Sequence, residues 1–100
     1  MDRLNWTAQA VKDVESICEF IAKDSPIYAR LFAKDILQAV QRLGNFPKSG
    51  RIVPEFSNKN IREIILGNYR IIYRIKPAVT EILTVYHSAR LLKSNIDKNT

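Results

Sequence analysis

Cysteine, histidine, tryptophan and glycine are all scarce in this sequence. Of its 100 residues, one is cysteine, one histidine, one tryptophan and three glycine. Cys18 has no second cysteine with which to form an intramolecular disulfide, so we expect a reduced, inert thiol. One cysteine and one histidine cannot supply the ligands of a usual zinc site. We therefore expect no metal site and no cofactor.

Long apolar runs are also absent. No run approaches the ~18 apolar residues that a membrane span needs. The first residues, MDRLNWT, lack the basic start and apolar core of a signal peptide. These absences predict a cytoplasmic protein without a membrane partner. No nucleophile-elbow motif indicates a hydrolase, and nothing in the chain points to a small-molecule substrate.

The composition is that of a globular protein with an excess of positive charge. Hydrophobic residues make up 46% and charged residues 26%, and the net charge is +6 at pH 7. A chain of this length has room for one domain, which we place at residues 1–100. The positive charge favours contact with nucleic acid or an acidic partner, although a well-hydrated surface would explain it equally.

The first half of the chain has apolar residues at helical spacing. Residues 4–6 can form a short strand, after which Thr7 is suited to cap a helix. Ser25 and Pro26 signal a second helix start, since serine caps well and proline fits the first helical position. The short link predicts an antiparallel hairpin ending at Gly44. The apolar positions are Ala10, Val11, Val14, Ile17, Cys18, Ile21, Tyr28, Leu31, Phe32, Ile36, Ala39, Val40 and Leu43.

The second half of the chain predicts a sheet. Asn45–Asn60 has little periodicity, and we expect it to connect the helices to the strands. Gly67 and Asn68 fit a two-residue hairpin turn, with glycine supplying a positive φ. The predicted strands are Ile61–Leu66, Tyr69–Lys76 and Thr80–His87, followed by a loose tail at residues 93–100. The predicted fold class is α+β, ordered β-α-α-β-β-β, with the helical hairpin packed on a small curved, mainly antiparallel sheet.

The hairpin turn also predicts which side chains share a face of the sheet. With a turn of two residues, the period of two puts Arg70 and Arg74 on the same face as Glu63. Arg62 then falls on the opposite face. A further set of side chains is expected to pack on the helices rather than stack on bases. These residues are Tyr69, Ile71, Tyr73 and Ile75.

Several short motifs follow one another in a recognisable order. They are SGRIVPE at 49–55, IREI at 61–64, GNYRIIYRI at 67–75 and ILTVYHSAR at 82–90. Together with the strand ending at Trp6 and the helical hairpin, this order resembles the RelE/ParE toxin superfamily of bacterial toxin-antitoxin modules, also labelled plasmid stabilisation proteins. The resemblance runs from Leu4 to about Leu92. It implies the β-α-α-β-β-β fold, binding to a cognate antitoxin and growth arrest by the free toxin.

The superfamily contains ribosome-dependent mRNA endonucleases and ParE-type proteins that poison DNA gyrase. RNA cleavage requires activation of a 2′-hydroxyl, protonation of the leaving oxygen and neutralisation of phosphate charge, which suit a carboxylate, a histidine and an arginine. By similarity to the YoeB-like endonucleases, Glu55 would be the catalytic glutamate, Arg70 the phosphate-binding arginine and His87 the catalytic histidine. Further candidates for contacts to nucleic acid or a partner are Arg62, Arg74 and Arg90.

Other positions favour the gyrase class. The YoeB-like enzymes follow the histidine with a tyrosine where this chain has Ser88, and RelE uses a late tyrosine that the chain lacks after Tyr86. Glu55 could also simply pair with an arginine, and His87 could be a structural residue. We predict that the chain is a toxin that poisons DNA gyrase and is partnered by its antitoxin. The alternatives are an endonuclease acting on mRNA at the ribosome and a non-toxic antitoxin-binding protein.

Overall fold

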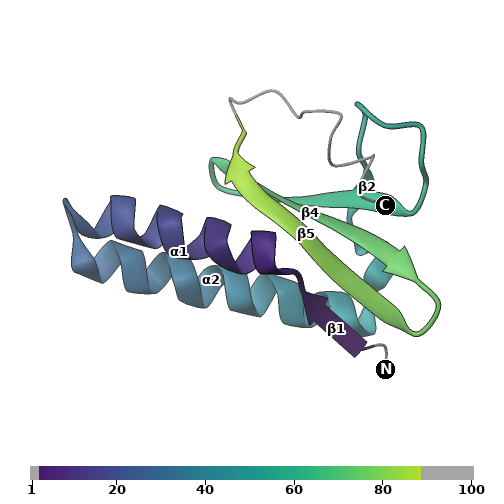
Figure 1. Ribbon diagram of the computed structural model, residues 1–100, viewed down its shortest axis with the longest axis horizontal. Coiled ribbons are helices and arrows are strands. Elements are labelled where there is room, and N and C mark those ends of the chain that lie inside the picture. The colour runs from purple at the N-terminus through teal and green to yellow at the C-terminus, as the bar shows by residue number, and fades with distance from the viewer. Residues whose placement is uncertain (1–2, 89–100) are drawn as a thin grey trace.

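The structure, a computed structural model, describes residues 3–88 and consists of a helical hairpin on one side of a five-stranded sheet (Figure 1). The strand order is β1-β5-β4-β3-β2; β1 runs parallel to β5, and the other neighbours are antiparallel. The predicted α+β class is confirmed. The elements are β1 (Arg3–Trp6), α1 (Ala8–Ala22), α2 (Pro26–Asn45), a 3₁₀ turn (Pro47–Ser49), β2 (Arg51–Ile52), β3 (Ile61–Leu66), β4 (Tyr69–Lys76) and β5 (Val79–His87).

Both predicted helix starts are capped as the sequence indicates. The Thr7 hydroxyl accepts a hydrogen bond from the Ala10 amide at 3.2 Å and donates one to the Ile82 carbonyl at 2.7 Å. It therefore satisfies an orphan amide of α1 and also ties the start of this helix to β5. Ser25 accepts from the Tyr28 amide at 3.2 Å, and Pro26 is the first residue of α2.

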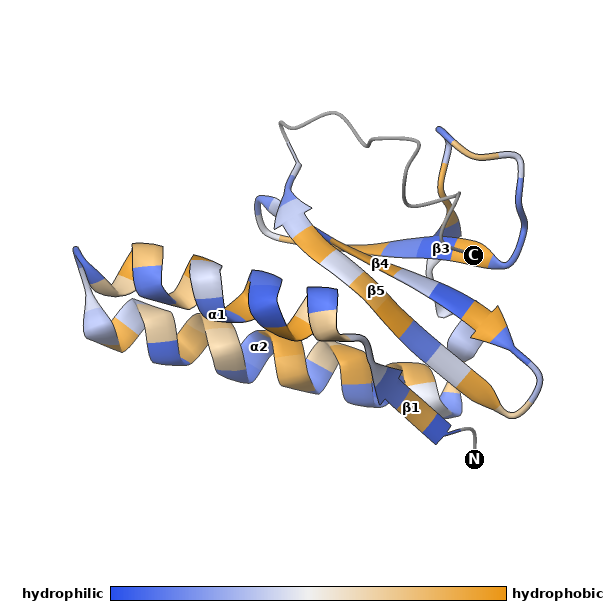
Figure 2. Ribbon diagram, in the orientation of Figure 1, coloured by the Kyte–Doolittle hydropathy of each residue, from blue (hydrophilic) through white to orange (hydrophobic). Residues whose placement is uncertain are grey.

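The main core lies between the helical hairpin and the sheet. Tyr73 is completely buried there, and Tyr69 and Ile75 pack against the same cluster, so the face assigned to these residues is confirmed. Figure 2 shows the apolar residues of α2 and the strands as orange segments interrupted by polar ones. The buried members of the cluster are Ala10, Ile36, Ala39, Val40, Leu43, Ile71, Tyr73, Ile82 and Val85.

A second, smaller cluster lies on the sheet face that points away from the hairpin. Ile72, which alternates with the core residues Ile71 and Tyr73 along β4, is buried in it. The chain between β2 and β3 covers this cluster, contributing the buried Val53 and the partly buried Phe56. The remaining members are Ile61, Leu83 and Tyr86. A loop rather than a helix therefore closes this side of the sheet.

The segment predicted as a plain connection is more structured than expected. Helix α2 continues through Gly44 to Asn45, and Arg51–Ile52 form the short edge strand β2. Arg51 pairs with Glu63 in the strand ladder, and Ile52 pairs with Arg62. The prediction missed this strand because two residues are too few to show alternation. Strands β1 and β5 each begin one residue earlier than predicted.

Strand β5 contains a bulge that the sequence did not indicate. Ile72 pairs with Thr84 but the next residue, Tyr73, pairs with Ile82, which leaves Leu83 as an extra residue in β5. Helix α1 is anchored at this irregularity, because the Asp13 carboxylate accepts hydrogen bonds from the Thr84 hydroxyl and from the Val85 amide.

Two sequence predictions fall outside the part of the chain that the structure describes. They are the tail at residues 93–100 and the candidate Arg90. Within residues 3–88, neither helix has the length and apolar character required to cross a membrane.

Candidate functional site

The candidate site is built on the β3–β4 hairpin, whose register matches the prediction. Gly67 has a φ of +58°, which allows the two-residue turn. Ile65 pairs with Arg70, and Glu63 pairs with Ile72. Glu63 and Arg70 therefore share the face away from the helices and are diagonal neighbours, a distance that two long side chains can bridge.

Arg70 holds two carboxylates at once. Its Nη1 and Nη2 atoms donate to the two carboxylate oxygens of Glu55 at 2.8 and 3.0 Å. Its Nε donates to Glu63 Oε1 at 2.5 Å, and Nη2 also contacts that oxygen. The guanidinium carbon lies 5.5 Å from the centre of the Tyr86 ring, within range of a cation-π interaction. Both donating edges of Arg70 are therefore occupied.

The two carboxylates differ in their exposure. Glu63 is 1% exposed, whereas the side chain of Glu55 is 35% exposed. Arg51 from the edge strand β2 binds the second oxygen of Glu63, so that the buried carboxylate lies between two arginines. The result is a linear network from Arg51 through Glu63 and Arg70 to Glu55. The buried end fixes the orientation of Arg70, and the Glu55 end reaches the surface.

The network shifts the proton affinities of its members. The hydrogen bonds from Arg70 lower the pKa of the Glu55 carboxyl from its ordinary value. The same bonds, with those to Glu63, raise the pKa of Arg70, which stays charged. A carboxylate with a lowered pKa and an arginine across both oxygens is a weak proton acceptor. In this arrangement Glu55 is a partner of Arg70 rather than a poised general base.

Two other candidate arginines also have partners. Arg74 donates from Nε and Nη2 to one oxygen of Glu81, at 3.0 and 2.6 Å, and lowers the pKa of the Glu81 carboxyl. Arg62 lies on the helix-facing side, opposite Tyr73 in the strand ladder, as the hairpin register predicted. Its guanidinium donates to backbone carbonyls rather than to a carboxylate.

The side chains of His87 and Arg70 lie on opposite faces of the sheet. The strand ladder places it opposite Tyr69, whereas Arg70 is opposite Tyr86. The rings of His87 and Tyr69 meet edge to face with centres 5.5 Å apart, and Tyr69 in turn packs on Phe32 of α2 at 4.9 Å. The structure thus brings Glu55 and Arg70 into contact and puts His87 on the helix side of the strand.

Sequence reasoning did not select Glu63 or Tyr86 as site residues, although both contact Arg70. A signal for Glu63 was present, because it is the one acidic residue within Ile61–Leu66 and the predicted register put it on the face of Arg70. A carboxylate on a strand that is otherwise largely apolar needs a charged partner when it is buried.

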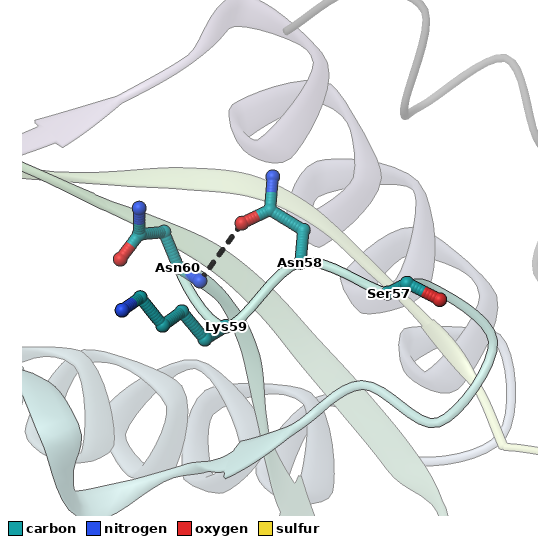
Figure 3. Close-up of a pocket in the computed structure, with 4 residues that line it drawn as sticks. All are labelled: Ser57, Asn58, Lys59 and Asn60. Carbon is teal, nitrogen blue, oxygen red and sulfur yellow. Dashed lines mark hydrogen bonds between the residues drawn. The ribbon is translucent and has the colours of Figure 1, made fainter.

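The described residues form open pockets at two places on the surface. An open pocket in the loop before β3 is lined by Ser57, Asn58, Lys59 and Asn60 (Figure 3). Another lies where α2 meets the 3₁₀ turn and is lined by Ala39, Arg42, Phe46, Ser49 and Ile64. Across residues 3–88, no three His, Cys, Asp or Glu side chains are grouped so as to hold a metal ion.

Comparison with known proteins identifies the family. Residues 4–92 match the model of the ParE toxin of the type II toxin-antitoxin system parDE. This chain belongs to the ParE toxin family. The match to the family model covers both helices, all of the sheet except Arg3, and every candidate residue named above.

Similar sequences include toxins from two bacteria. The chain is 39% identical over 88 residues to the toxin homologue Y4kP of Sinorhizobium fredii, covering 86% of this chain and 88% of that protein. It is 28% identical over 92 residues to the toxin RelE2 of Caulobacter vibrioides, covering 91% of this chain and all of that protein. Both of these relatives are toxins by name.

Solved structures share the fold at low sequence identity. The chromosomal ParDE system from P. aeruginosa contains a chain with a TM-score of 0.72 and 23% identity, and the match covers 87% of this chain and 96% of that one. The RelBE2 toxin-antitoxin complex from Mycobacterium tuberculosis gives a TM-score of 0.60 and 20% identity, with coverages of 86% and 96%. These matches confirm the helical hairpin on a mostly antiparallel sheet.

Proposed function

We propose that this chain is the toxin of a type II toxin-antitoxin module which, when free of its antitoxin in the bacterial cytoplasm, arrests growth by binding DNA gyrase. Membership of the ParE toxin family supports the toxin role. The choice of gyrase over RNA cleavage depends on the geometry around Arg70.

The observation that carries this choice is the occupancy of Arg70. An arginine that neutralises a reacting phosphate needs at least one open edge, yet Glu55 takes one edge of Arg70 and Glu63 the other. The histidine that would complete a cleavage site is paired with Tyr69 on the helix side of the sheet. Glu55 in turn is a weakened base. A protein that acts by binding needs none of these groups to be reactive.

The charges on the outer face of the sheet support the same choice. Arg51, Arg70 and Arg74 are each matched to a carboxylate of Glu55, Glu63 or Glu81. A surface whose cations are paired in this way attracts an RNA chain less than one with open cations does. It suits contact with a protein, where complementary charges set the orientation of the partners.

An antitoxin partner is supported by the helical hairpin. Phe20 near the end of α1, together with Ile27, Tyr28 and Leu31 in the first turns of α2, presents large apolar side chains to solvent. Figure 1 shows this end of the hairpin projecting beyond the sheet. Exposed apolar clusters of this kind mark protein-binding surfaces, and an amphipathic segment of a cognate antitoxin would cover it. The solved relatives include toxin-antitoxin complexes.

The proposal is tested with substitutions at the groups that RNA cleavage would require. We expect Glu55→Gln and His87→Ala to retain growth arrest and inhibition of DNA supercoiling by purified gyrase within a few-fold of the wild type. The matched control is Glu81→Gln, which removes a comparable carboxylate from Arg74 on the same face. Loss of about a hundredfold or more in activity at Glu55 and His87, but not at Glu81, would contradict the proposal, because it is the effect expected of general acid-base groups.

A ribosome-dependent mRNA endonuclease is the second candidate. The direct contact between Glu55 and Arg70 favours it, since a carboxylate beside an arginine is half of the expected cleavage site. The match to the toxin RelE2 along the whole of that protein points the same way. For this function Glu55 would have to leave Arg70 as the RNA phosphate arrives, and His87 would have to reach the other face of the sheet.

A further inference from the structure

The excess positive charge of this chain is unevenly distributed. Residues 8–45, which form the helical hairpin, contain five cationic and five acidic residues. Residues 46–62, which form the loops around β2, contain four cationic residues and one acidic residue. Three of the four, Lys48, Lys59 and Arg62, form what we call the basic corner.

Arg62 draws the backbone of the basic corner together. Its Nε donates to the carbonyl of Lys59 at 3.1 Å, and its Nη1 donates to the carbonyls of Gly50 at 3.0 Å and Lys48 at 3.4 Å. One guanidinium therefore touches the backbone on both sides of the β2 strand. The backbones of Lys48 and Lys59, which lie 11 residues apart in sequence, are therefore held at the same corner of the molecule.

The charges of the basic corner have no acidic partner among residues 3–88. No carboxylate in that range lies within ion-pair distance of Lys48, Lys59 or Arg62, whereas Arg51 and Arg74 each have one carboxylate partner and Arg70 has two. Backbone carbonyls stabilise the Arg62 cation but do not cancel its charge. Lys48 and Lys59 are exposed to solvent. The corner is therefore an open site of positive potential beside a sheet face whose arginines are neutralised.

Small polar side chains lie next to Lys59 in the basic corner. The pocket of Figure 3 is lined by Ser57, Asn58, Lys59 and Asn60, and a hydrogen bond of 2.9 Å from the Asn60 amide to Asn58 Oδ1 holds its turn. In Figure 3 the side chains of Lys59 and Asn60 extend to the same side of this turn. Hydroxyl and amide groups next to lysines are the donors that contact phosphate oxygens in nucleic-acid complexes.

We propose that the basic corner binds the phosphodiester backbone of duplex DNA. Single-stranded nucleic acid is usually gripped by aromatic side chains that stack on its bases. Of the two aromatic residues among residues 46–62, Phe56 packs into the second apolar cluster. Phe46, two residues before Lys48, is 64% exposed and lines the pocket where α2 meets the 3₁₀ turn. The corner thus offers charge and hydrogen-bond donors beside one exposed ring, rather than the series of rings on which successive bases stack, and this suits a duplex read through its phosphates. This site is separate from Arg70 and does not depend on which target the toxin has.

The test measures the salt dependence of binding to a short fluorescent DNA duplex by fluorescence anisotropy, using the full chain. Each phosphate contact contributes a slope of about −0.9 to the plot of log K against log salt, so three contacts predict about −2.7. In the double variant Lys48→Gln, Lys59→Gln we expect the slope to fall in size by about 1.8. Arg62 is left unchanged because it holds the loops. The control is Lys12→Gln, Lys34→Gln, which removes the same charge from the helical hairpin.

Each outcome has a defined meaning. A slope that falls in the corner variant and stays within about 0.5 of the wild type in the hairpin variant supports the proposal. An equal fall in both variants would mean attraction by net charge alone, and tighter binding to a single-stranded RNA of equal length would mean that RNA is the ligand. Either result would overturn it. Growth arrest by the corner variant is scored separately, so failure here is distinguishable from failure of the gyrase proposal.

Discussion

At the scale of single residues, the buried carboxylate of Glu63 fixes the orientation of the Arg70 side chain. It accepts from Arg70 on one side and from Arg51 on the other while being almost completely buried. An arginine with a long flexible side chain would otherwise sample many rotamers. With Glu63 in place, its remaining edge is aimed at Glu55 on the surface loop.

Replacement of Glu63 is expected to be costly. Glu63→Gln would leave Arg70, which is 7% exposed, without its buried counter-charge. Breaking a buried ion pair at one partner costs ~3 kcal/mol or more in the free energy of unfolding. Glu55→Gln, at the exposed end of the network, is expected to cost about 1 kcal/mol or less because solvent screens it. Urea unfolding monitored by circular dichroism measures both. Equal costs for the two variants would contradict this ranking.

The lowered pKa of Glu55 predicts a pH dependence with a definite sign. A carboxyl whose pKa is lower in the folded than in the unfolded state stabilises the fold above its unfolded pKa of ~4.3, and this stabilisation is lost as the pH falls through the folded pKa. The difference in unfolding free energy between the wild type and Glu55→Gln should therefore be largest near neutral pH and vanish in acid. Urea unfolding across this pH range checks it.

The Arg74 pair provides a parallel measurement. Arg74 lowers the pKa of Glu81 in the same way, so Glu81→Gln is expected to converge with the wild type in acid as well. A difference that stayed constant with pH would show that the substitution acts through packing rather than charge.

The sequence predicted these residue contacts only in part. Glu55 and Arg70 were selected by the family resemblance, and their contact fits the alternative that Glu55 pairs with an arginine. The register placed Glu63 on the correct face, but its burial depends on the loop from Val53 to Asn60 closing over the second cluster. That closure is a tertiary effect that alternation along a strand does not encode.

At the scale of elements, the join between α2 and the sheet is held by Tyr73. Its hydroxyl donates to the Pro47 carbonyl at 2.7 Å and accepts from the Gly50 amide at 2.9 Å. Arg62 donates to the Gly50 carbonyl from the neighbouring strand. Both the 3₁₀ turn and the edge strand β2 are therefore pinned to the centre of the sheet.

Gly50 leaves no room for a side chain at this join. A Cβ atom there would lie 2.5 Å from the Glu63 carbonyl oxygen and 2.5 Å from Tyr73 Oη. We expect Gly50→Ala to destabilise the fold by about 1 to 3 kcal/mol through overpacking and loss of the Tyr73 hydrogen bonds. Urea unfolding measures the change in the free energy of unfolding, and we expect any local effect in β2.

Gly67→Ala is the contrasting variant for this prediction. A Cβ at Gly67 meets nothing within 4 Å, and its cost comes from the positive φ alone, about 1 kcal/mol. The two variants destabilise the fold for different reasons. Only the destabilisation by Gly50→Ala should become smaller when Tyr73→Phe is introduced at the same time. Additive costs for that pair would contradict a direct clash.

The elements themselves show where sequence patterns suffice. Thr7, Ser25 and Pro26 mark the helix starts because capping is local chemistry, and Gly67 marks the hairpin turn for the same reason. The bulge at Leu83 and the two-residue strand β2 were not predicted. Both depend on pairing with a neighbouring strand rather than on a run of residues.

At the scale of the whole molecule, charge separates the structure into three regions. The helical hairpin is balanced in charge and exposes apolar side chains at its free end. The outer sheet face has paired arginines and carboxylates, and the basic corner beside it is open. We expect an antitoxin to bind the free end of the hairpin and DNA to bind the basic corner. The charges of the outer sheet face would orient a protein target.

The central claim is that the free toxin stops DNA synthesis by binding gyrase and leaves translation intact at first. The most direct measurement follows the incorporation of labelled thymidine and labelled amino acids within minutes of inducing this chain in bacteria without its antitoxin. We predict that thymidine incorporation falls first while amino-acid incorporation continues. A prompt fall in amino-acid incorporation with thymidine uptake maintained would contradict the claim and identify an mRNA endonuclease acting through Glu55, Arg70 and His87.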